Sequence, residues 1–186
     1  MKRFDTAKLA MSVFIASEAV FFAFLIAAYV YYYGAVVQGP RASNSLDPPR
    51  TLIFTVCLLS SSATLWRAER HLAAAHNRAF RLWLGATILL GALFIFGQAL
   101  EYTGLIAKSI TPARNLFGAT FFTLTGFHGL HVLCGLISLS VVLVLAFMRS
   151  FGPREISGLG AVSMYWHFVD AVWIVIFSLV YVTVWI

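Results

Sequence analysis

Long apolar stretches separated by short polar connections dominate the sequence. A helix needs about 20 apolar residues to cross the hydrocarbon core of a bilayer, and five stretches meet or approach that length. They lie at roughly 9–33, 51–67, 82–106, 116–148 and 159–186. Stretches of this length favour helices over strands. We therefore predict an all-α polytopic membrane protein, a single transmembrane domain (1–186) built as a bundle of five helices.

The first apolar stretch follows basic residues, as the apolar region of a secretory signal peptide does. Lys2 and Arg3 precede it, but it contains Glu18 and ends in tyrosines at 31–33. A cleavage site would instead have small residues at its end. We therefore expect this stretch to remain in the protein as a membrane span.

Basic residues are unevenly distributed between the two ends of the predicted bundle. With five spans, nine Lys and Arg residues fall on the side that holds the N-terminus and four fall on the other side. Cytoplasmic loops of membrane proteins carry the excess of Lys and Arg. We therefore predict that the N-terminus is cytoplasmic and that the C-terminus lies outside.

The composition excludes several classes of protein. Of the 186 residues, 61% are hydrophobic and 11% are charged, whereas a soluble domain has roughly 25% charged residues. A soluble enzyme of this size could not bury such an excess, and a disordered chain would be far more polar. The net charge of +6 is explained by the loops of a membrane protein, so we expect no nucleic-acid partner.

Ionisable side chains inside the predicted spans are the candidates for function. Each costs about 2.5–3.5 kcal/mol at the centre of an inserted helix, so each one needs a physical reason to be there. The candidates are Glu18, Glu101, His128, His131, His167 and Asp170.

Glu18 has no basic residue near it on its own predicted helix. An orphaned carboxyl in hydrocarbon is costly, so we expect its partner to come from another helix or from a lipid headgroup. Two interpretations stay open. The residue is either a protonated carboxyl that is hydrogen-bonded inside the bundle, or a carboxyl linked to proton transfer or lipid binding.

His128 and His131 are three residues apart in the fourth span, a spacing that places them on one helical face. Metal and haem ligands are often presented in this way. However, no spacing in the sequence supplies the remaining ligands. We therefore favour buried hydrogen bonds between helices, for which Gly126 and Gly129 permit a close approach.

His167 and Asp170 have the same spacing in the fifth span. A histidine that donates a ring N–H to a carboxylate forms a self-satisfied buried pair, and such a pair can also relay protons. Glu101, next to Tyr102, lies near the end of the third span. A carboxylate is cheap at the headgroup level, so we expect a structural pairing there.

The sequence has no P-loop and no GxSxG, HExxH or CxxCH motif. We therefore expect no catalytic, cofactor-binding or metal-binding residue in this chain. Four stretches of the sequence resemble motifs of subunit III of the haem-copper oxygen reductases, the cytochrome c oxidase and quinol oxidase family. They are FIASEAVFF at 14–22, QALEY at 98–102, GATFF at 118–122 running on to TGFHGLHV at 125–132, and YWHFVD at 165–170 with Trp173.

The resemblance implies a non-catalytic core subunit without haem or copper of its own, since these cofactors belong to partner subunits I and II. It implies direct contact with subunit I, and support of its stability and proton uptake. It also implies contact with other oxidase subunits and bound phospholipid, and it is compatible with a respiratory supercomplex. Glu18 matches the family's buried membrane carboxylate. The other polar motif positions are matched by Glu101, His128, His131, His167 and Asp170.

One departure from the family concerns length. The longer family form has seven helices, and this chain begins at what would be the third. The family's lipid cleft lies between its first two helices and the other five, so a second subunit would have to supply one wall. The short form suggests a bacterial chain in the cytoplasmic (inner) membrane.

Two other functions stay open at this point. Short relatives of subunit III also occur as accessory membrane subunits of nitric oxide reductases. An independent proton channel could be built around Glu18 and the His167–Asp170 pair. The electron donor, cytochrome c or quinol, is not legible in this chain.

Overall fold

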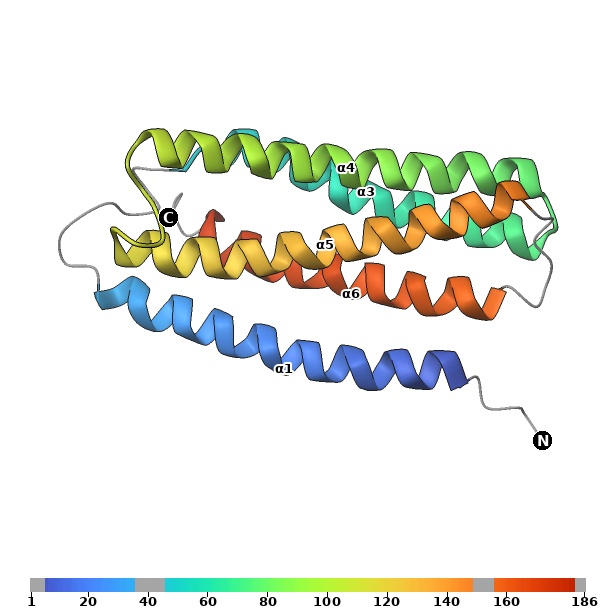
Figure 1. The fold of residues 1–186 in the computed structure, drawn as a ribbon, viewed down its shortest axis with the longest axis horizontal. Helices are drawn as coiled ribbons and strands as arrows, with labels where there is room; N and C mark the ends of the chain where they lie inside the picture. The colour runs from blue at the N-terminus through green and yellow to red at the C-terminus, as the bar shows by residue number, and fades with distance from the viewer. Residues whose placement is uncertain (1–5, 36–45, 149–155, 183–186) are drawn as a thin grey trace.

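A computed structural model describes residues 6–35, 46–148 and 156–182. These residues form five helices and no strand: α1 (Thr6–Ala35), α3 (Pro48–Ala73), α4 (Asn77–Ala107), α5 (Leu116–Met148) and α6 (Ile156–Val180) (Figure 1). All five are long and apolar enough to cross a membrane. The prediction of an all-α, five-helix membrane protein is confirmed. The orientation of the termini remains a prediction.

Helix α3 is longer than its apolar stretch at both ends. Asp47 caps its start by accepting a hydrogen bond from the backbone N–H of Arg50 (3.3 Å). Pro48 and Pro49 occupy the first turn, where a helix has no use for their missing N–H groups. The apolar pattern therefore marks the part of the helix that suits hydrocarbon, and capping residues extend the helix beyond it.

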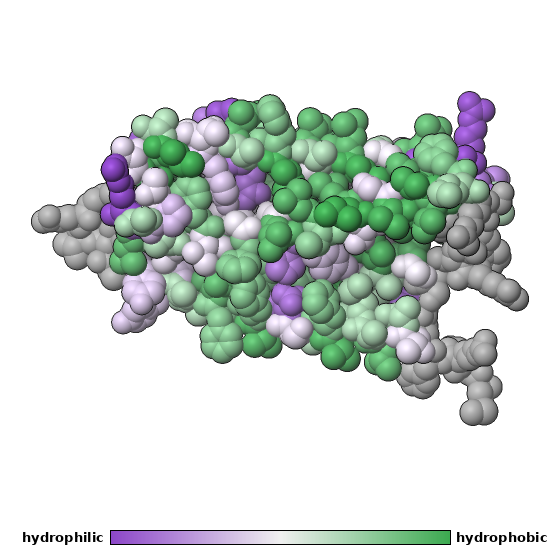
Figure 2. Space-filling model, viewed as in Figure 1, coloured by the Kyte–Doolittle hydropathy of each residue, from purple (hydrophilic) through white to green (hydrophobic). Residues whose placement is uncertain are grey.

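The helices form three groups (Figure 1). The antiparallel pair α3 and α4 covers one side of α5 and α6, and α1 packs against α5 and α6 from another side. Helix α1 is peripheral, because only 6% of its most apolar window is buried, whereas 44% of the corresponding window of α6 is buried. The face shown in Figure 2 is mostly apolar, with polar atoms interrupting it between α5 and α1.

Two tryptophans of α6 fasten this helix to its neighbours. A Cβ atom at Gly91 of α4 would lie 2.8 Å from the Trp166 ring, and one at Gly135 of α5 would lie 2.7 Å from it. The indole therefore fits only because both positions are glycine. Trp166 also donates its N–H to Ser61 Oγ of α3 (2.9 Å). Trp173 Nε1 donates to Thr55 Oγ1 (3.0 Å), seven residues further along α6.

Candidate functional site

The six ionisable candidates do not form one site. They divide into a pair at the α1–α5 interface, a carboxylate between α3, α4 and α6, a cluster at the α3–α6 interface, and one histidine in the core. The first group joins Glu18 and His131, the second contains Glu101, the third contains His167 and Asp170, and the last is His128.

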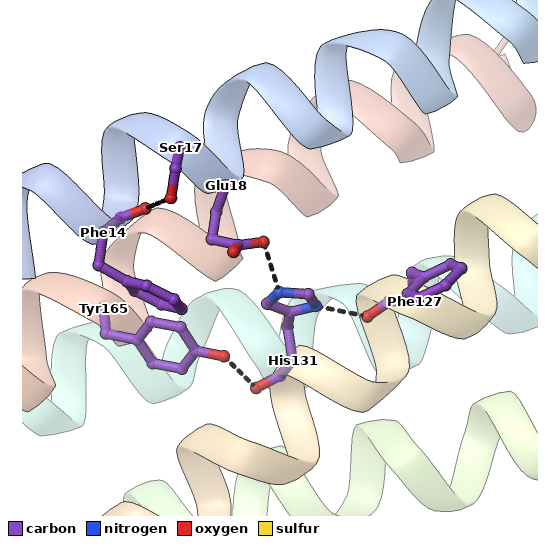
Figure 3. Close-up of polar contacts among 6 residues, drawn as sticks. All are labelled: Phe14, Ser17, Glu18, Phe127, His131 and Tyr165. Carbon is purple, nitrogen blue, oxygen red and sulfur yellow. Dashed lines mark hydrogen bonds and ion pairs between the residues drawn. The ribbon is translucent and has the colours of Figure 1, made fainter.

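Glu18 and His131 form the pair that joins α1 to α5 (Figure 3). Glu18 Oε2 lies 3.0 Å from His131 Nε2. The other ring nitrogen, Nδ1, lies 2.7 Å from the carbonyl oxygen of Phe127, one turn earlier in α5. The His131 and Glu18 side chains are 14% and 20% exposed, respectively. The expectation that a partner for Glu18 comes from another helix is met by this pair.

The hydrogen-bond geometry fixes how many protons the pair holds. A carbonyl oxygen can only accept a hydrogen bond, so Nδ1 of His131 must carry a proton and donate it to Phe127. If the ring is neutral, Nε2 is a bare acceptor and the Glu18 carboxyl must be protonated to donate to it. If the ring is charged, Nε2 donates to a carboxylate. Both arrangements place one proton between Glu18 and Nε2 and leave the pair electrically neutral.

Aromatic side chains surround this pair (Figure 3). The Tyr165 hydroxyl of α6 donates to the backbone carbonyl of His131 (3.0 Å), and the Phe14 ring of α1 lies against the Tyr165 ring, with centroids 6.2 Å apart. Phe22 presents an edge-to-face contact to the His131 ring at 5.0 Å. Ser17 turns away and donates to the Phe14 carbonyl (2.7 Å). The pair is thus held by apolar groups and contacts few other polar atoms.

Glu101 has a different set of partners. Thr51 Oγ1 of α3 donates to its Oε1 (3.0 Å), and the hydroxyl of Tyr181, just beyond α6, donates to its Oε2 (2.6 Å). Both carboxylate oxygens accept from hydroxyl groups, so this carboxylate connects three helical segments. The expected structural role of Glu101 fits this geometry, although its partners lie on distant parts of the chain.

The neighbouring Tyr102 belongs to another network. Its hydroxyl lies 2.8 Å from Thr125 Oγ1 and accepts from Gln98 Nε2 (3.0 Å), which also donates to the Thr125 carbonyl (2.7 Å). A Cβ atom at Gly129 would come within 2.7 Å of the Gln98 side chain. Glu101 and Tyr102 therefore belong to separate networks, because consecutive side chains on a helix point about 100° apart.

His167 and Asp170 meet through a serine that the sequence patterns did not single out. Ser62 Oγ of α3 lies 2.8 Å from His167 Nδ1 and also donates to Asp170 Oδ2. No hydrogen bond joins His167 to Asp170 directly within the described residues, and the buried Oδ1 of Asp170 has no partner there. The expectation of a self-satisfied pair is therefore wrong, because a serine on a neighbouring helix lies between the two side chains.

His128 is fully buried and does not share its surroundings with His131. Its ring stacks on Trp173 with centroids 4.8 Å apart and contacts Phe94 edge to face at 5.8 Å. Its two ring nitrogens find no hydrogen-bond partner among the described residues. The expectation of an interhelical hydrogen bond for His128 is wrong. His128 and His131 share one broad face of α5, but they contact different helices across it. Residues three apart differ by about 60° around a helix axis, which is enough to direct them to different neighbours of α5.

The six ionisable candidates could bind a metal ion only if several of them lay close together. Within the described part of the chain, no group of three or more His, Cys, Asp or Glu side chains could hold a metal ion. The functional groups that sequence reasoning missed are hydroxyls: Ser62, Thr51 and Tyr181. The run Ser60 to Ser62 inside an apolar span was a usable signal, because small hydroxyl residues often hydrogen-bond across membrane helices.

Comparison with known proteins identifies the family. The family model described as cytochrome c oxidase subunit III matches residues 3–185. Cytochrome c oxidase subunit 3 of Corynebacterium diphtheriae is 37% identical, over 91% of this chain and 84% of that protein. Cytochrome bo(3) ubiquinol oxidase subunit 3 of Pseudomonas aeruginosa is 36% identical, over 90% and 80%. A probable cytochrome c oxidase subunit 3 of Mycobacterium tuberculosis is 36% identical, over 91% and 84%. The chain therefore belongs to the cytochrome c oxidase subunit III family.

Proposed function

We propose that this chain binds the catalytic subunit of a haem-copper terminal oxidase directly and supports its proton uptake and its stability during turnover. The family consists of subunits of multi-subunit oxidases, and the described residues form five helices that are long and apolar enough to span a membrane. Oxygen reduction takes place at haem and copper centres, which we assign to partner subunits I and II, and we assign the proton channels to subunit I. The setting we propose is the cytoplasmic membrane of a bacterium, with phospholipid bound and a respiratory supercomplex as a larger assembly.

The observation that supports a role in proton uptake is the Glu18–His131 pair. It holds one proton between a carboxyl and an imidazole, and moving that proton from one group to the other needs no change in the heavy-atom contacts. The two side chains are also 20% and 14% exposed at the interface of the peripheral helix α1. The pair therefore borders the molecular surface, where a partner subunit can contact it. Glu101, by contrast, is held by hydroxyl groups.

The choice of electron donor belongs to other subunits. The relatives include a subunit of a ubiquinol oxidase as well as subunits of cytochrome c oxidases. The sequence identity of this chain to the two kinds of subunit is nearly equal, at 36% and 37%. We therefore propose that this chain serves the catalytic subunit in the same way with either donor.

The test is to purify the oxidase through an affinity tag on this chain in mild detergent. We expect haem and copper to co-purify with the tagged chain. Removal of the chain should leave initial oxygen consumption but shorten the number of turnovers before inactivation. The Glu18→Gln complex should retain the subunit and the initial rate, yet pump fewer protons per electron or inactivate earlier.

Ser17→Ala is the matched control. Among the described residues, the Ser17 side chain hydrogen-bonds only within its own helix, to the Phe14 carbonyl, so this variant should behave as the unaltered protein. A tagged chain that purifies without haem would contradict the subunit assignment. A Glu18→Gln complex indistinguishable from the control would contradict the role in proton uptake.

A further inference from the structure

A cavity of about 230 Å³ lies between α3 and α4 at the end of the bundle where α3 begins and α4 ends. Its walls are apolar and include Phe54, Leu100 and Leu105, and its polar lining includes Thr51 and Glu101. We call it the α3–α4 cavity. It differs from the lipid cleft that the family resemblance implies, because that cleft has the two further N-terminal helices of the longer family form as one wall.

The charges around the α3–α4 cavity balance. Two basic residues, Arg50 and Lys108, and two acidic residues, Asp47 and Glu101, line it. Lys108 follows the end of α4, seven residues after Glu101, or about 10 Å along the axis. Lys108 nevertheless lines the same cavity as Glu101. Both signs of charge therefore border one small volume.

This pattern selects among ligands by charge. A simple anion would meet the carboxylates, and a simple cation would meet the two basic groups. A molecule that carries both a phosphate and an ammonium group matches all four residues. Arg and Lys are the usual phosphate binders. A carboxylate has about four acceptor positions, and hydroxyl groups of Thr51 and Tyr181 use two at Glu101, which leaves two for an ammonium group.

The size and depth of the cavity match the same chemistry. A single buried water needs about 10–15 Å³ of such volume, so a cavity of about 230 Å³ has room for a polar headgroup the size of phosphoethanolamine. Helix α4 has 31 residues and is about 46 Å long, which exceeds a hydrocarbon core of about 30 Å. Its ends therefore reach the headgroup region, where the cavity lies.

We propose that the α3–α4 cavity binds the phosphoethanolamine headgroup of an aminophospholipid. Arg50 and Lys108 contact the phosphate, and Glu101 and Asp47 accept from the ammonium group. The apolar walls formed by Phe54, Leu100 and Leu105 contact the start of the acyl chains.

Gly104 provides a way to fill the cavity without disturbing the fold. It lines the α3–α4 cavity, and a Cβ atom there would meet nothing within 4 Å. A Cβ atom at Gly85, on the same helix, would also meet nothing within 4 Å, but Gly85 does not line the cavity. Gly104→Leu therefore fills the space that the ligand would occupy. Gly85→Leu is the control, because it makes the same glycine-to-leucine change in α4 away from the cavity.

The experiment uses the purified oxidase that contains this chain. The partly delipidated complex is incubated with detergent micelles holding equal amounts of phosphatidylethanolamine and phosphatidylglycerol, and native mass spectrometry counts the bound lipids. The unaltered complex and Gly85→Leu should retain one more phosphatidylethanolamine than Gly104→Leu. Glu101→Gln keeps an acceptor oxygen but gives the cavity a net positive charge, so its preference for phosphatidylethanolamine should fall roughly tenfold in favour of phosphatidylglycerol.

Three results would overturn the proposal. Equal lipid counts in Gly104→Leu and Gly85→Leu would place the lipid elsewhere. Equal retention of both lipids by the unaltered complex would show that the cavity does not recognise the ammonium group. Displacement of the lipid by free phosphoethanolamine at equal concentration would show that the headgroup chemistry is right but that the ligand is a soluble molecule rather than a lipid. None of these readouts depends on turnover, so their failure is separate from failure of the proposed function.

Discussion

Two glutamates connect helices in this protein, and they do so with opposite kinds of partner. Glu101 accepts from the hydroxyl groups of Thr51 and Tyr181, which remain protonated at all physiological pH values. Glu18 faces His131, whose ring nitrogen can either give or take a proton. Glu101 joins the main bundle of α3, α4, α5 and α6 internally, whereas Glu18 attaches the peripheral helix α1 to that bundle.

The comparison shows how the partner decides what a carboxyl inside a membrane helix can do. Hydroxyl donors stabilise one arrangement of Glu101 and its two neighbours, which suits a structural connection. An imidazole that already donates through its other nitrogen leaves one proton to be shared with Glu18. The Glu18–His131 pair can therefore respond to a change in its surroundings, while the Glu101 connection cannot do so without losing hydrogen bonds.

The largest effect is expected at the structural connection. Glu101→Leu leaves the Tyr181 hydroxyl without its acceptor, whereas the Thr51 hydroxyl keeps the Asp47 carbonyl (3.1 Å). An unsatisfied buried group costs about 1–3 kcal/mol, so we expect a loss of that order and a clearly lower temperature for thermal release of the chain from the purified complex. Glu101→Gln, which keeps one acceptor oxygen, should lose less than half as much. Equal stability of Glu101→Leu and the unaltered chain would show that the connection is not structural.

A smaller effect is expected at the α1–α5 interface. Hydrogen bonds between membrane helices contribute about 0.6 kcal/mol on average and up to about 1.7 kcal/mol, so Glu18→Leu should cost about that much. Glu18→Gln should cost little, because its amide N–H can donate to His131 Nε2.

A double-mutant cycle makes this expectation measurable. Glu18→Leu and His131→Leu, separately and together, should show a coupling of about 0.6–1.7 kcal/mol in thermal release. Additive effects of the two substitutions would mean that the contact between the side chains does not stabilise the interface.

An effect similar to that at Glu18 is expected at Ser62, where a hydroxyl group connects α3 to α6. Ser62→Ala removes the hydrogen bonds to His167 and Asp170, and we expect a loss of about 1 kcal/mol. The exposed Ser60→Ala, two residues earlier, should change stability by less than about 0.5 kcal/mol. Equal losses of stability in the two variants would show that the Ser62 hydroxyl does not stabilise the α3–α6 interface.

The helices could be predicted from the sequence because long apolar stretches suffice to define membrane spans. The ends of the helices could not, since the start of α3 depends on the Asp47 cap and on two prolines rather than on hydropathy. The ionisable candidates were found because charge inside a span is rare. Their partners depend on which face of each helix meets which neighbour, and spacing along one helix does not contain that information.

The histidines illustrate this limit. His128 and His131 have the spacing of a shared face, but α5 lies between α1 and the main bundle, so a rotation of about 60° directs one ring to Trp173 and the other to Glu18. The hydroxyl partners Ser62 and Tyr181 escaped notice for another reason. Neutral residues cost little inside a membrane helix, so their presence there needs no special explanation.

The central claim is that Glu18 and His131 share one proton because Nδ1 of His131 is already protonated. Nitrogen-15 solid-state NMR of histidine-labelled complex in lipid bilayers tests this directly, with a His131→Gln complex used to assign the His131 signals by difference. We predict a protonated Nδ1 in the unaltered complex, and an Nε2 signal that changes in Glu18→Gln while Nδ1 keeps its proton. An unprotonated Nδ1 beside a protonated Nε2 would contradict the claim, since the ring would then donate to Glu18 and leave the Phe127 carbonyl without a donor.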